Sequence, residues 1–434
     1  MGKTIILGSG ISGLSAGFHL KKNGIDSEIY EKNQDWGGLC SNFEIDGFRF
    51  DKFVHFTFTN DEYIRQIFES KIPLLEHPAI SNNYYKGFWL KHPAQNNLFP
   101  LPLKEKFNII KNFTSRKRTE ISDIKNYAEW LQCQYGDYFA HNFPFAYTRK
   151  YWGKEAEELE TKWVGNRMHS PSLIQVLKGA FFHNKKNFYY TNVMRYPEKG
   201  GFKSILCGLH EDLDIKLNKK AVEINTEEKL VKFEDGEIQS YQNLISSIPL
   251  PEIVKIIKNC PQAVLDAANK LKHTCGYMVS LGFNREDIAK DLWFYIYDED
   301  ILSARVYSPS LKSKDNVPTG YSSIQAEIFF ANDAEILSPE VVLKNTIEKL
   351  SKIMNFKESE ILVKDIRFEK YANVIFDHKI YENRKIVLDY LVSVDIKSIG
   401  RFGKWEYMWT NQAFMDGKST AEDIIHKLTA DGSL

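Results

Sequence analysis

The chain has 434 residues, of which 43% are hydrophobic, 26% are charged and 14% are aromatic. These fractions are ordinary for a globular protein, and they exclude a disordered chain, a collagen and a disulfide-rich miniprotein. Lysine plus arginine and aspartate plus glutamate both number 57, so the net charge is zero, which argues against a uniformly basic nucleic-acid binder.

The first thirty residues predict a strand–turn–helix–strand unit. Residues 4–7 (TIIL) form a short apolar run, and the turn sequence GSGISG follows at once over residues 8–13. The pattern of residues 14–20 indicates a helix that packs closely on a sheet and ends near Gly24. Residues 27–30 predict the second strand, which ends at Glu31.

After this unit, a helical region precedes a second group of strands. Residues 103–190 contain few glycines and predict helices. Strands are expected at residues 219–233, 244–248, 277–283, 293–297 and 322–330, and an amphipathic helix is expected at 417–429. The chain has no internal repeat and no flexible linker, so we expect two interwoven domains.

Gly8, Gly10 and Gly13 match the G-x-G-x-x-G fingerprint in the required strand–turn–helix context. The first glycine permits the tight turn, the second lets the backbone approach a pyrophosphate, and the third lets the helix pack on the strand. The start of the helix then offers free N–H groups to phosphates. Glu31 stands where a carboxylate accepts hydrogen bonds from ribose. The unit therefore predicts binding of an adenine dinucleotide.

Glu31-Lys32 followed by Gly37-Gly38-Leu39 resembles the extended fingerprint of FAD-binding flavoproteins in the amine oxidase and protoporphyrinogen oxidase superfamily. The alternative is a simple surface turn. The resemblance implies FAD as the cofactor and an α/β fold. That fold would be a Rossmann-like FAD-binding domain of the glutathione reductase-like type, with an inserted α+β substrate-binding domain.

Other segments resemble either branch of this superfamily. Residues 43–51 resemble the hairpin that follows the fingerprint, and residues 92–98 resemble the protoporphyrinogen oxidase-like proteins. Residues 55–61 resemble UDP-galactopyranose mutase, in which a histidine and an aromatic residue lie beside the isoalloxazine. His55 and Phe56 are thereby implied as catalytic residues. A core histidine is the alternative for His55.

Two further segments extend the resemblance towards the C-terminus. Residues 147–153 (YTRKYWG) are similar to a mutase motif, although Arg149 replaces its glutamate, and residues 196–202 resemble a segment of both families. Residues 400–403 (GRFG) and the residues after them resemble the C-terminal flavin-contacting motif. The mutases usually have Asn-Met-Asp there, whereas this chain has Asn-Gln-Ala at 411–413.

The substrate residues are less well defined. The mutases clamp a diphosphate with two arginines, and Arg167 and Arg305 are the best candidates here, with an ordinary ion pair as the alternative. Trp152 and Tyr371 are candidate walls of the substrate pocket, with core packing as the alternative. The residues expected to hold FAD are Gly8, Gly10, Ile11, Ser12, Gly13, Glu31, Lys32, Gly38, Leu39, Val222, Gly400, Arg401, Tyr407, Asn411, Gln412 and Ala413.

These patterns lead to one main functional prediction and two alternatives. The prediction is an FAD-dependent oxidoreductase that transfers hydride from a small molecule to flavin N5. The first alternative is a sugar-nucleotide mutase that uses reduced FAD as a nucleophile. The second is a binding protein related to the chaperones of prenylated GTPases, which fits poorly because those proteins lack the intact glycine set. The FAD domain is expected at 1–75, 203–275 and 365–434, and the substrate domain at 76–202 and 276–364.

The remaining features concern compartment and partners. The five cysteines are odd in number and form no C-x-x-C pair, so a disulfide framework and a zinc site are not expected. Cys40 could be a redox or flavin-linking thiol, although a buried inert thiol is the simpler interpretation. No signal peptide or long apolar run is present, so we expect cytoplasmic residence. A small-molecule substrate is expected, a homodimer is permitted, and the basic run 111–118 could contact anionic lipid or only solvent.

Overall fold

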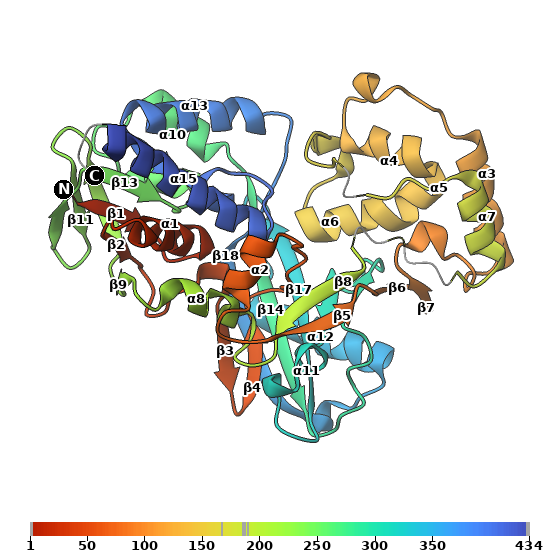
Figure 1. Cartoon of the computed structure of the whole chain (residues 1–434). Helices are drawn as coiled ribbons and strands as arrows, with labels where there is room; N and C mark the ends of the chain where they lie inside the picture. Colours follow the sequence, from red (N-terminus) through yellow and green to blue (C-terminus); the bar gives the residue numbers. More distant parts are fainter. Residues whose placement is uncertain (1–2, 166–167, 185–187, 189–190, 431–434) are drawn as a thin grey trace.

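The computed structural model describes residues 3–165, 168–184, 188 and 191–430. Figure 1 shows a parallel sheet with its helices at one side, a long mixed sheet in the middle and a group of helices at the far side. The candidate residue Arg167 and the neighbouring residue 166 lie outside the described residues, as do 185–187 and 189–190.

The parallel sheet has the strand order β19-β13-β1-β2-β9. Its members are β1 (Thr4–Leu7), β2 (Ser27–Tyr30), β9 (Asp214–Lys216), β13 (Asn243–Ser246) and β19 (Ile396–Ser398). Helix α1 (Ile11–Lys22) connects β1 to β2 and packs along α15 (Thr410–Ala430). The predicted strand–turn–helix–strand unit and the predicted Rossmann-like α/β fold are therefore confirmed.

Glycines allow α1 to lie unusually close to its neighbours. A Cβ atom on Gly13 would lie 2.0 Å from the carbonyl oxygen of Gly8, and one on Gly417 of α15 would lie 2.2 Å from the carbonyl oxygen of Ser12. Because neither position has room for a side chain, the start of α1 is held against both the glycine turn and α15.

A mixed sheet forms the centre of the molecule, with the order β18-β14-β17-β16-β15-β6-β7. Its strands are β6 (Asn82–Tyr85), β7 (Phe88–Lys91), β14 (His273–Phe283), β15 (Trp293–Ile296), β16 (Arg305–Tyr307), β17 (Ser322–Ala331) and β18 (Ile361–Val374). Helix α12 (Pro339–Met354) packs on β14. The predicted strands at 277–283, 293–297 and 322–330 are present in this sheet.

The remaining strands form three smaller sheets. They are the antiparallel set β10 (Ala221–Asn225), β11 (Leu230–Phe233) and β12 (Ile238–Ser240), the hairpin β3 (Asn42–Ile45) and β4 (Phe48–Asp51), and the pair β5 (Leu74–Pro78) and β8 (Val193–Pro197). The other α-helices of these regions are α2 (Glu62–Phe68), α8 (Cys207–His210), α9 (Leu250–Ile253), α10 (Gln262–Asn269), α11 (Pro309–Lys312), α13 (Ile380–Ser393) and α14 (Gly400–Gly403).

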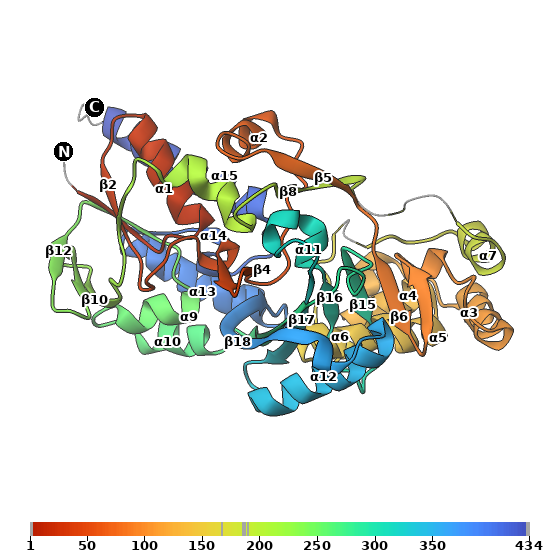
Figure 2. The ribbon, with the colours of Figure 1, turned by 90° about the horizontal axis from the view of Figure 1, so that it is seen from below.

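The predicted helical region forms a separate group beyond the mixed sheet, as seen from two directions (Figures 1 and 2). It contains α3 (Leu103–Ser115), α4 (Tyr127–Tyr135), α5 (Asp137–Ala140), a π-helical turn (His141–Phe145), α6 (Ala146–Trp152) and α7 (Leu173–Phe181). Strands β14 and β18 run through the predicted domain boundaries near residues 275 and 365, so these strands join the two regions. The division into two domains stays a prediction.

A buried ion pair connects three of these elements. The Nζ atom of Lys312, at the end of α11, lies 3.0 Å from Oδ2 of Asp51 on β4, and both side chains are at most 1% exposed. The carboxylate also accepts hydrogen bonds from the Tyr196 hydroxyl of β8 and the Phe202 backbone N–H. Burial lowers the pKa of Lys312, and the Asp51 carboxylate opposes that shift.

Replacing Lys312 by alanine would leave the Asp51 carboxylate buried without its cation. We expect Lys312→Ala to lower the free energy of unfolding by about 3–5 kcal/mol. Urea denaturation measures this loss. Lys344→Ala, at an exposed position of α12, is the control and should change stability by no more than roughly 0.5 kcal/mol. A loss below about 1 kcal/mol for Lys312→Ala would show that the ion pair is dispensable.

Candidate functional site

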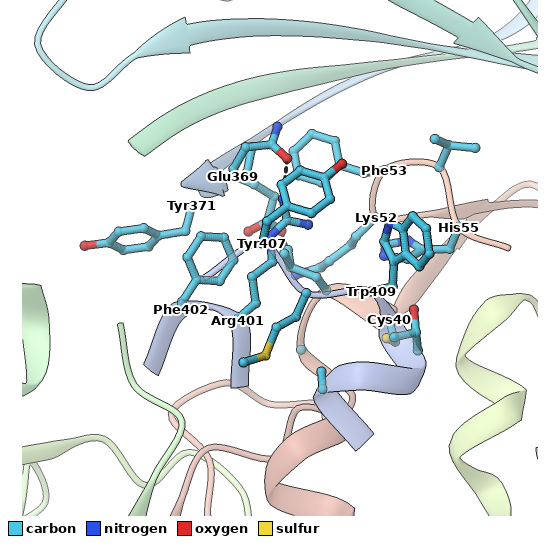
Figure 3. Close-up of a pocket in the computed structure, with 18 of the residues that line it drawn as sticks. Cys40, Lys52, Phe53, His55, Glu369, Tyr371, Arg401, Phe402, Tyr407 and Trp409 are labelled. Atoms are coloured by element: carbon cyan, nitrogen blue, oxygen red, sulfur yellow. Dashed lines mark hydrogen bonds and ion pairs between the residues drawn. The ribbon is translucent and has the colours of Figure 1, made fainter. Parts of the chain in front are cut away.

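A cavity of about 860 Å³ runs from the glycine turn after β1 to the helical region. Segments that are distant in the sequence meet in it. Figure 3 shows Lys52, Phe53 and His55 of the N-terminal region gathered with Arg401 and Tyr407 of the C-terminal region. Most of the residues predicted as a site therefore lie around one cavity.

The first turn of α1 forms one end of this cavity. Gly8, Gly10, Ile11 and Ser12 line it, and no side chain caps the helix start at Gly10. The N–H groups of the first turn thus remain available to an anionic ligand. Gly13 does not line the cavity, because it faces the turn behind it.

Glu31 is fixed beside the glycine turn. Its Oε2 atom accepts hydrogen bonds from the backbone N–H and the hydroxyl of Ser9, at 3.0 and 2.9 Å. Its Oε1 atom accepts two more from Asn33, at 3.0 Å from the backbone and 2.7 Å from the side chain. The carboxylate is therefore held in one position at the end of β2, with Lys32 beside it in the cavity wall.

The second glycine turn lies directly against the first. Gly38 has φ +58°, and a Cβ atom there would lie 3.1 Å from the Cα atom of Gly10. The Gly37 N–H donates to the Ser9 carbonyl at 3.0 Å. The two turns together form a cradle of bare backbone. Leu39 and Cys40 continue its wall, and burial, with a smaller effect of Asp51, raises the pKa of Cys40 to about 12, which fits an inert thiol.

Arg401 of α14 provides a cation in the same cavity. One terminal nitrogen donates to Asn373 Oδ1 at 2.7 Å, and the guanidinium lies 5.0 Å from the centre of the Tyr407 ring. The Nε atom is buried and has no hydrogen-bond partner among the described residues. A buried N–H of a cation without a partner suits an anionic group bound in the cavity.

The other C-terminal predictions divide into two groups. Gly400, Tyr407, Asn411 and Ala413 line the cavity, whereas Gln412 does not. The Gln412 side chain instead accepts a hydrogen bond from the Trp409 N–H at 2.9 Å. Val222 also lies outside the cavity wall, to which its neighbour Ala221 contributes.

His55 and Phe56, which follow one another in the chain, both lie in the cavity wall. The His55 ring stacks on Phe202 with centroids 4.9 Å apart, and its Nδ1 atom is buried without a hydrogen-bond partner in the described part of the chain. Burial lowers the pKa of His55 to about 4. The imidazole is therefore neutral at neutral pH and can both donate and accept a hydrogen bond.

Aromatic rings line the opposite end of the cavity. They are Tyr127, Tyr135, Phe139, Tyr147, Tyr151, Trp152, Trp163, Tyr295, Tyr297 and Phe329. The candidate wall residues Trp152 and Tyr371 both line the cavity, and the Tyr371 hydroxyl donates to Glu252 at 2.6 Å. Tyr147 and Tyr151 belong to the motif at 147–153 but were not named as site residues, and the remaining rings were missed because they carry no local motif.

Arg305 is the cation at this aromatic end. Its Nε atom pairs with the buried Glu327 carboxylate, and its guanidinium lies 5.6 Å from the centre of the Tyr151 ring. Burial opposes its charge, but Glu327 outweighs that effect and raises the pKa of Arg305. Its terminal nitrogens have no hydrogen-bond partner among the residues described. Arg149, which stands where the mutase motif has a glutamate, forms an ion pair with Glu299 at the surface.

Asn373 and Lys52 also line the cavity and were not predicted. Asn373 Oδ1 accepts hydrogen bonds from Arg401 and from the Tyr151 hydroxyl, at 2.7 and 3.1 Å. It thereby connects the two ends of the cavity. Lys52 forms an ion pair with Glu369 at 2.7 Å.

Within the described ranges, no His, Cys, Asp and Glu cluster could hold a metal ion, and no helix is long and apolar enough to cross a membrane.

Comparisons with known proteins identify the fold. The family model described as NAD(P)-binding Rossmann-like domain matches residues 6–70. Among curated proteins, the 1-hydroxycarotenoid 3,4-desaturase of Flavobacterium sp. (strain P99-3) is 49% identical over 51 residues, which are 12% of this chain and 10% of that protein. The chain therefore matches only about a tenth of the length of this relative.

Two solved structures resemble nearly the whole chain. A reduced UDP-galactopyranose mutase superposes with a TM-score of 0.91 at 23% identity, covering 98% of this chain and 96% of its own. A protein of Exiguobacterium sp. 255-15, provisionally named protoporphyrinogen oxidase, superposes with a TM-score of 0.75 at 16% identity, covering 97% and 98%. The resemblance predicted from the sequence is thus confirmed at the level of the fold.

The low pKa of His55 predicts a pH dependence of stability. In the unfolded chain the His55 side chain binds a proton below pH 6.5, whereas in the folded chain it does so only at about pH 4. The free energy of unfolding therefore falls as the pH is lowered through this window. His55→Gln removes the titration, and its free energy of unfolding should fall less between these pH values. Denaturant titrations at both ends of the window measure the difference. The control His141→Gln, at an exposed position, should keep the wild-type slope; equal slopes for all three proteins would refute the assignment.

Proposed function

We propose that this chain is an FAD-dependent enzyme that isomerises a nucleotide sugar in the manner of UDP-galactopyranose mutase. One observation carries the proposal. A single cavity has a dinucleotide cradle at one end and a ring-lined pocket with a partly unpaired arginine at the other. The nearly complete superposition on UDP-galactopyranose mutase supports it.

The cradle fits FAD. The free N–H groups at the start of α1, the bare backbone at Gly38 and the unpartnered Nε of Arg401 suit a pyrophosphate. Glu31 stands at the end of β2, where it would meet the adenosine ribose and would repel a 2′-phosphate. Reduced flavin supplies a nucleophile when bound here, and oxidised flavin supplies a hydride acceptor. His55 and Phe56 would lie beside the flavin ring.

The other end fits a nucleotide diphosphate attached to a sugar. Aromatic rings offer stacking surfaces for a uracil, and they exclude water from the reacting centre. Arg305 keeps its charge through Glu327 while its terminal nitrogens stay available for a phosphate oxygen. Because Glu327 fixes the guanidinium, little freedom is lost when a phosphate binds. Arg167 is proposed as the second phosphate-binding arginine.

A second candidate function is net oxidation of a flat apolar substrate. Two curated relatives, matched over 51 and 46 residues, are carotenoid desaturases, and the many rings of the cavity suit an apolar molecule. In that case the substrate would give hydride to the flavin, and Arg305 would serve only to balance Glu327. The two functions share the cofactor cradle and differ at the aromatic end.

A substitution in the cradle tests the cofactor assignment. Gly38→Ala adds a methyl group against the Gly10 backbone. We expect the purified variant to retain several-fold less flavin than the wild type, measured by visible absorption at about 450 nm. Gly320→Ala is the matched control, since it introduces the same kind of backbone strain where no atom lies within 4 Å. Equal flavin content in both variants would contradict the proposed cradle.

The reaction is tested with UDP-galactopyranose and its furanose isomer. We expect dithionite-reduced protein to interconvert them without consuming an electron acceptor. Arg305→Lys keeps the positive charge but loses the planar fork, so KM should rise roughly tenfold with a smaller change in kcat. Lys344→Arg on α12 is the control. No isomerisation, together with bleaching of oxidised flavin by an apolar substrate, would replace this proposal with the oxidoreductase.

A further inference from the structure

Helices α3 and α7 lie side by side at the outer end of the helical region, in both views of the molecule (Figures 1 and 2). Each helix buries one stripe of residues. On α3 the stripe includes Ile109 and Phe113, and on α7 it includes Val176 and Ala180. Both inner faces are therefore already occupied by the core.

The outer faces of the same helices carry a second apolar set. We call it the α3–α7 face, and its residues are Leu103, Phe107, Leu173, Ile174, Phe181 and Phe182. These side chains are between 39% and 74% exposed. Scattered apolar side chains on a surface are normal, but their concentration on two helices that contact each other is typical of a contact surface.

Unpaired cations lie on the same two helices and just after α3. Residues 99–118 contain six lysines and arginines but a single acidic residue, Glu105, and α7 adds Lys178. Lys104, Lys111, Lys117, Arg118 and Lys178 are exposed, and none of them forms an ion pair within the part of the chain described. The zero net charge of the whole chain conceals this local excess.

We propose that the α3–α7 face docks on an anionic lipid surface. Helices that carry leucine and phenylalanine on one side and lysine and arginine around it are typical of segments that lie in the membrane interface. The apolar side chains would enter the boundary of the acyl chains, while the cations would contact anionic headgroups. The absence of a membrane-crossing helix among the described residues is compatible with such peripheral binding.

Two other occupants fit less well. A second copy bound through the same face by two-fold symmetry would bring the unpaired cations of both copies together, which costs free energy. A nucleic acid would satisfy the cations but would leave the six apolar side chains without a partner. A lipid surface satisfies both kinds of side chain at once.

The location of the face gives docking a consequence for the cavity. His169 and Phe188 line the cavity and stand just before and just after α7 in the chain. Docking through α7 would therefore bring the aromatic end of the cavity close to the lipid surface. This inference does not depend on the reaction proposed above, since it rests on the outer helices alone.

Vesicle flotation of the full-length protein tests the proposal. We expect wild-type protein to float with phosphatidylcholine vesicles that contain roughly a third phosphatidylglycerol, and to float much less with phosphatidylcholine alone. Phe107→Glu combined with Ile174→Glu should lower the bound fraction at least tenfold. Lys117→Gln combined with Arg118→Gln should weaken the affinity for the anionic vesicles roughly thirtyfold, because each cation contributes on the order of 1 kcal/mol there.

Matched controls separate docking from a general loss of folding. Ile386→Glu combined with Val392→Glu places the same charges on the exposed side of α13, and Lys344→Gln removes an exposed cation elsewhere. Both should float like the wild type. Failure of the wild type to float, or equal flotation of the α3–α7 variants, would overturn the proposal. A dimer in light scattering that Phe107→Glu with Ile174→Glu converts to a monomer, without vesicle binding, would assign the face to a second copy instead.

Discussion

The cavity depends on a buried ion pair that no local sequence pattern reveals. Asp51 ends β4, and Lys312 ends α11, so their contact joins the hairpin near the N-terminus to the mixed sheet. Burying two charges is costly unless hydrogen bonds satisfy them, and here Tyr196 and the Phe202 backbone supply those bonds. The pair therefore fixes where the chain leaves β4, and residues 52–56, which form part of the cavity wall, follow directly.

A second buried carboxylate holds the same wall from the other side. Glu327 of β17 accepts the Val54 N–H at 2.6 Å through Oε1 and pairs with Arg305 through Oε2. One side chain thus connects the loop that carries His55 to the cation at the aromatic end. Asn373 makes a similar connection between Arg401 and Tyr151. These polar side chains couple the two ends of the cavity, and the proposed function requires such a connection between its cofactor and its substrate.

Most residues that the sequence nominated for the cofactor line one cavity, because their nomination rests on local spacing. Gly8 and Gly10, the helix after them and Glu31 follow one another within about thirty residues, and their roles follow from backbone geometry. Gly13, Val222 and Gln412, which were also expected to hold FAD, belong to the same segments but do not line the cavity, so their roles stay predictions. Beyond the segment 147–153, the rings of the aromatic end could not be predicted, because Tyr127, Tyr295 and Phe329 come from separate elements that meet only through long-range packing.

Charge illustrates why composition alone misleads about binding. The equal numbers of acidic and basic residues argue against a general polyanion binder, yet the cations are distributed unevenly. Many lie in surface ion pairs, such as Arg149 with Glu299, and contribute little to recognition. The cations that indicate a binding site are those whose N–H donors have no partner among the described residues. They are the terminal nitrogens of Arg305, the Nε of Arg401 and the exposed lysines of α3 and α7. In the cavity such donors are enclosed by rings and suit one bound phosphate at a time, whereas on the outer helices they are spread around an apolar face and suit an extended anionic surface.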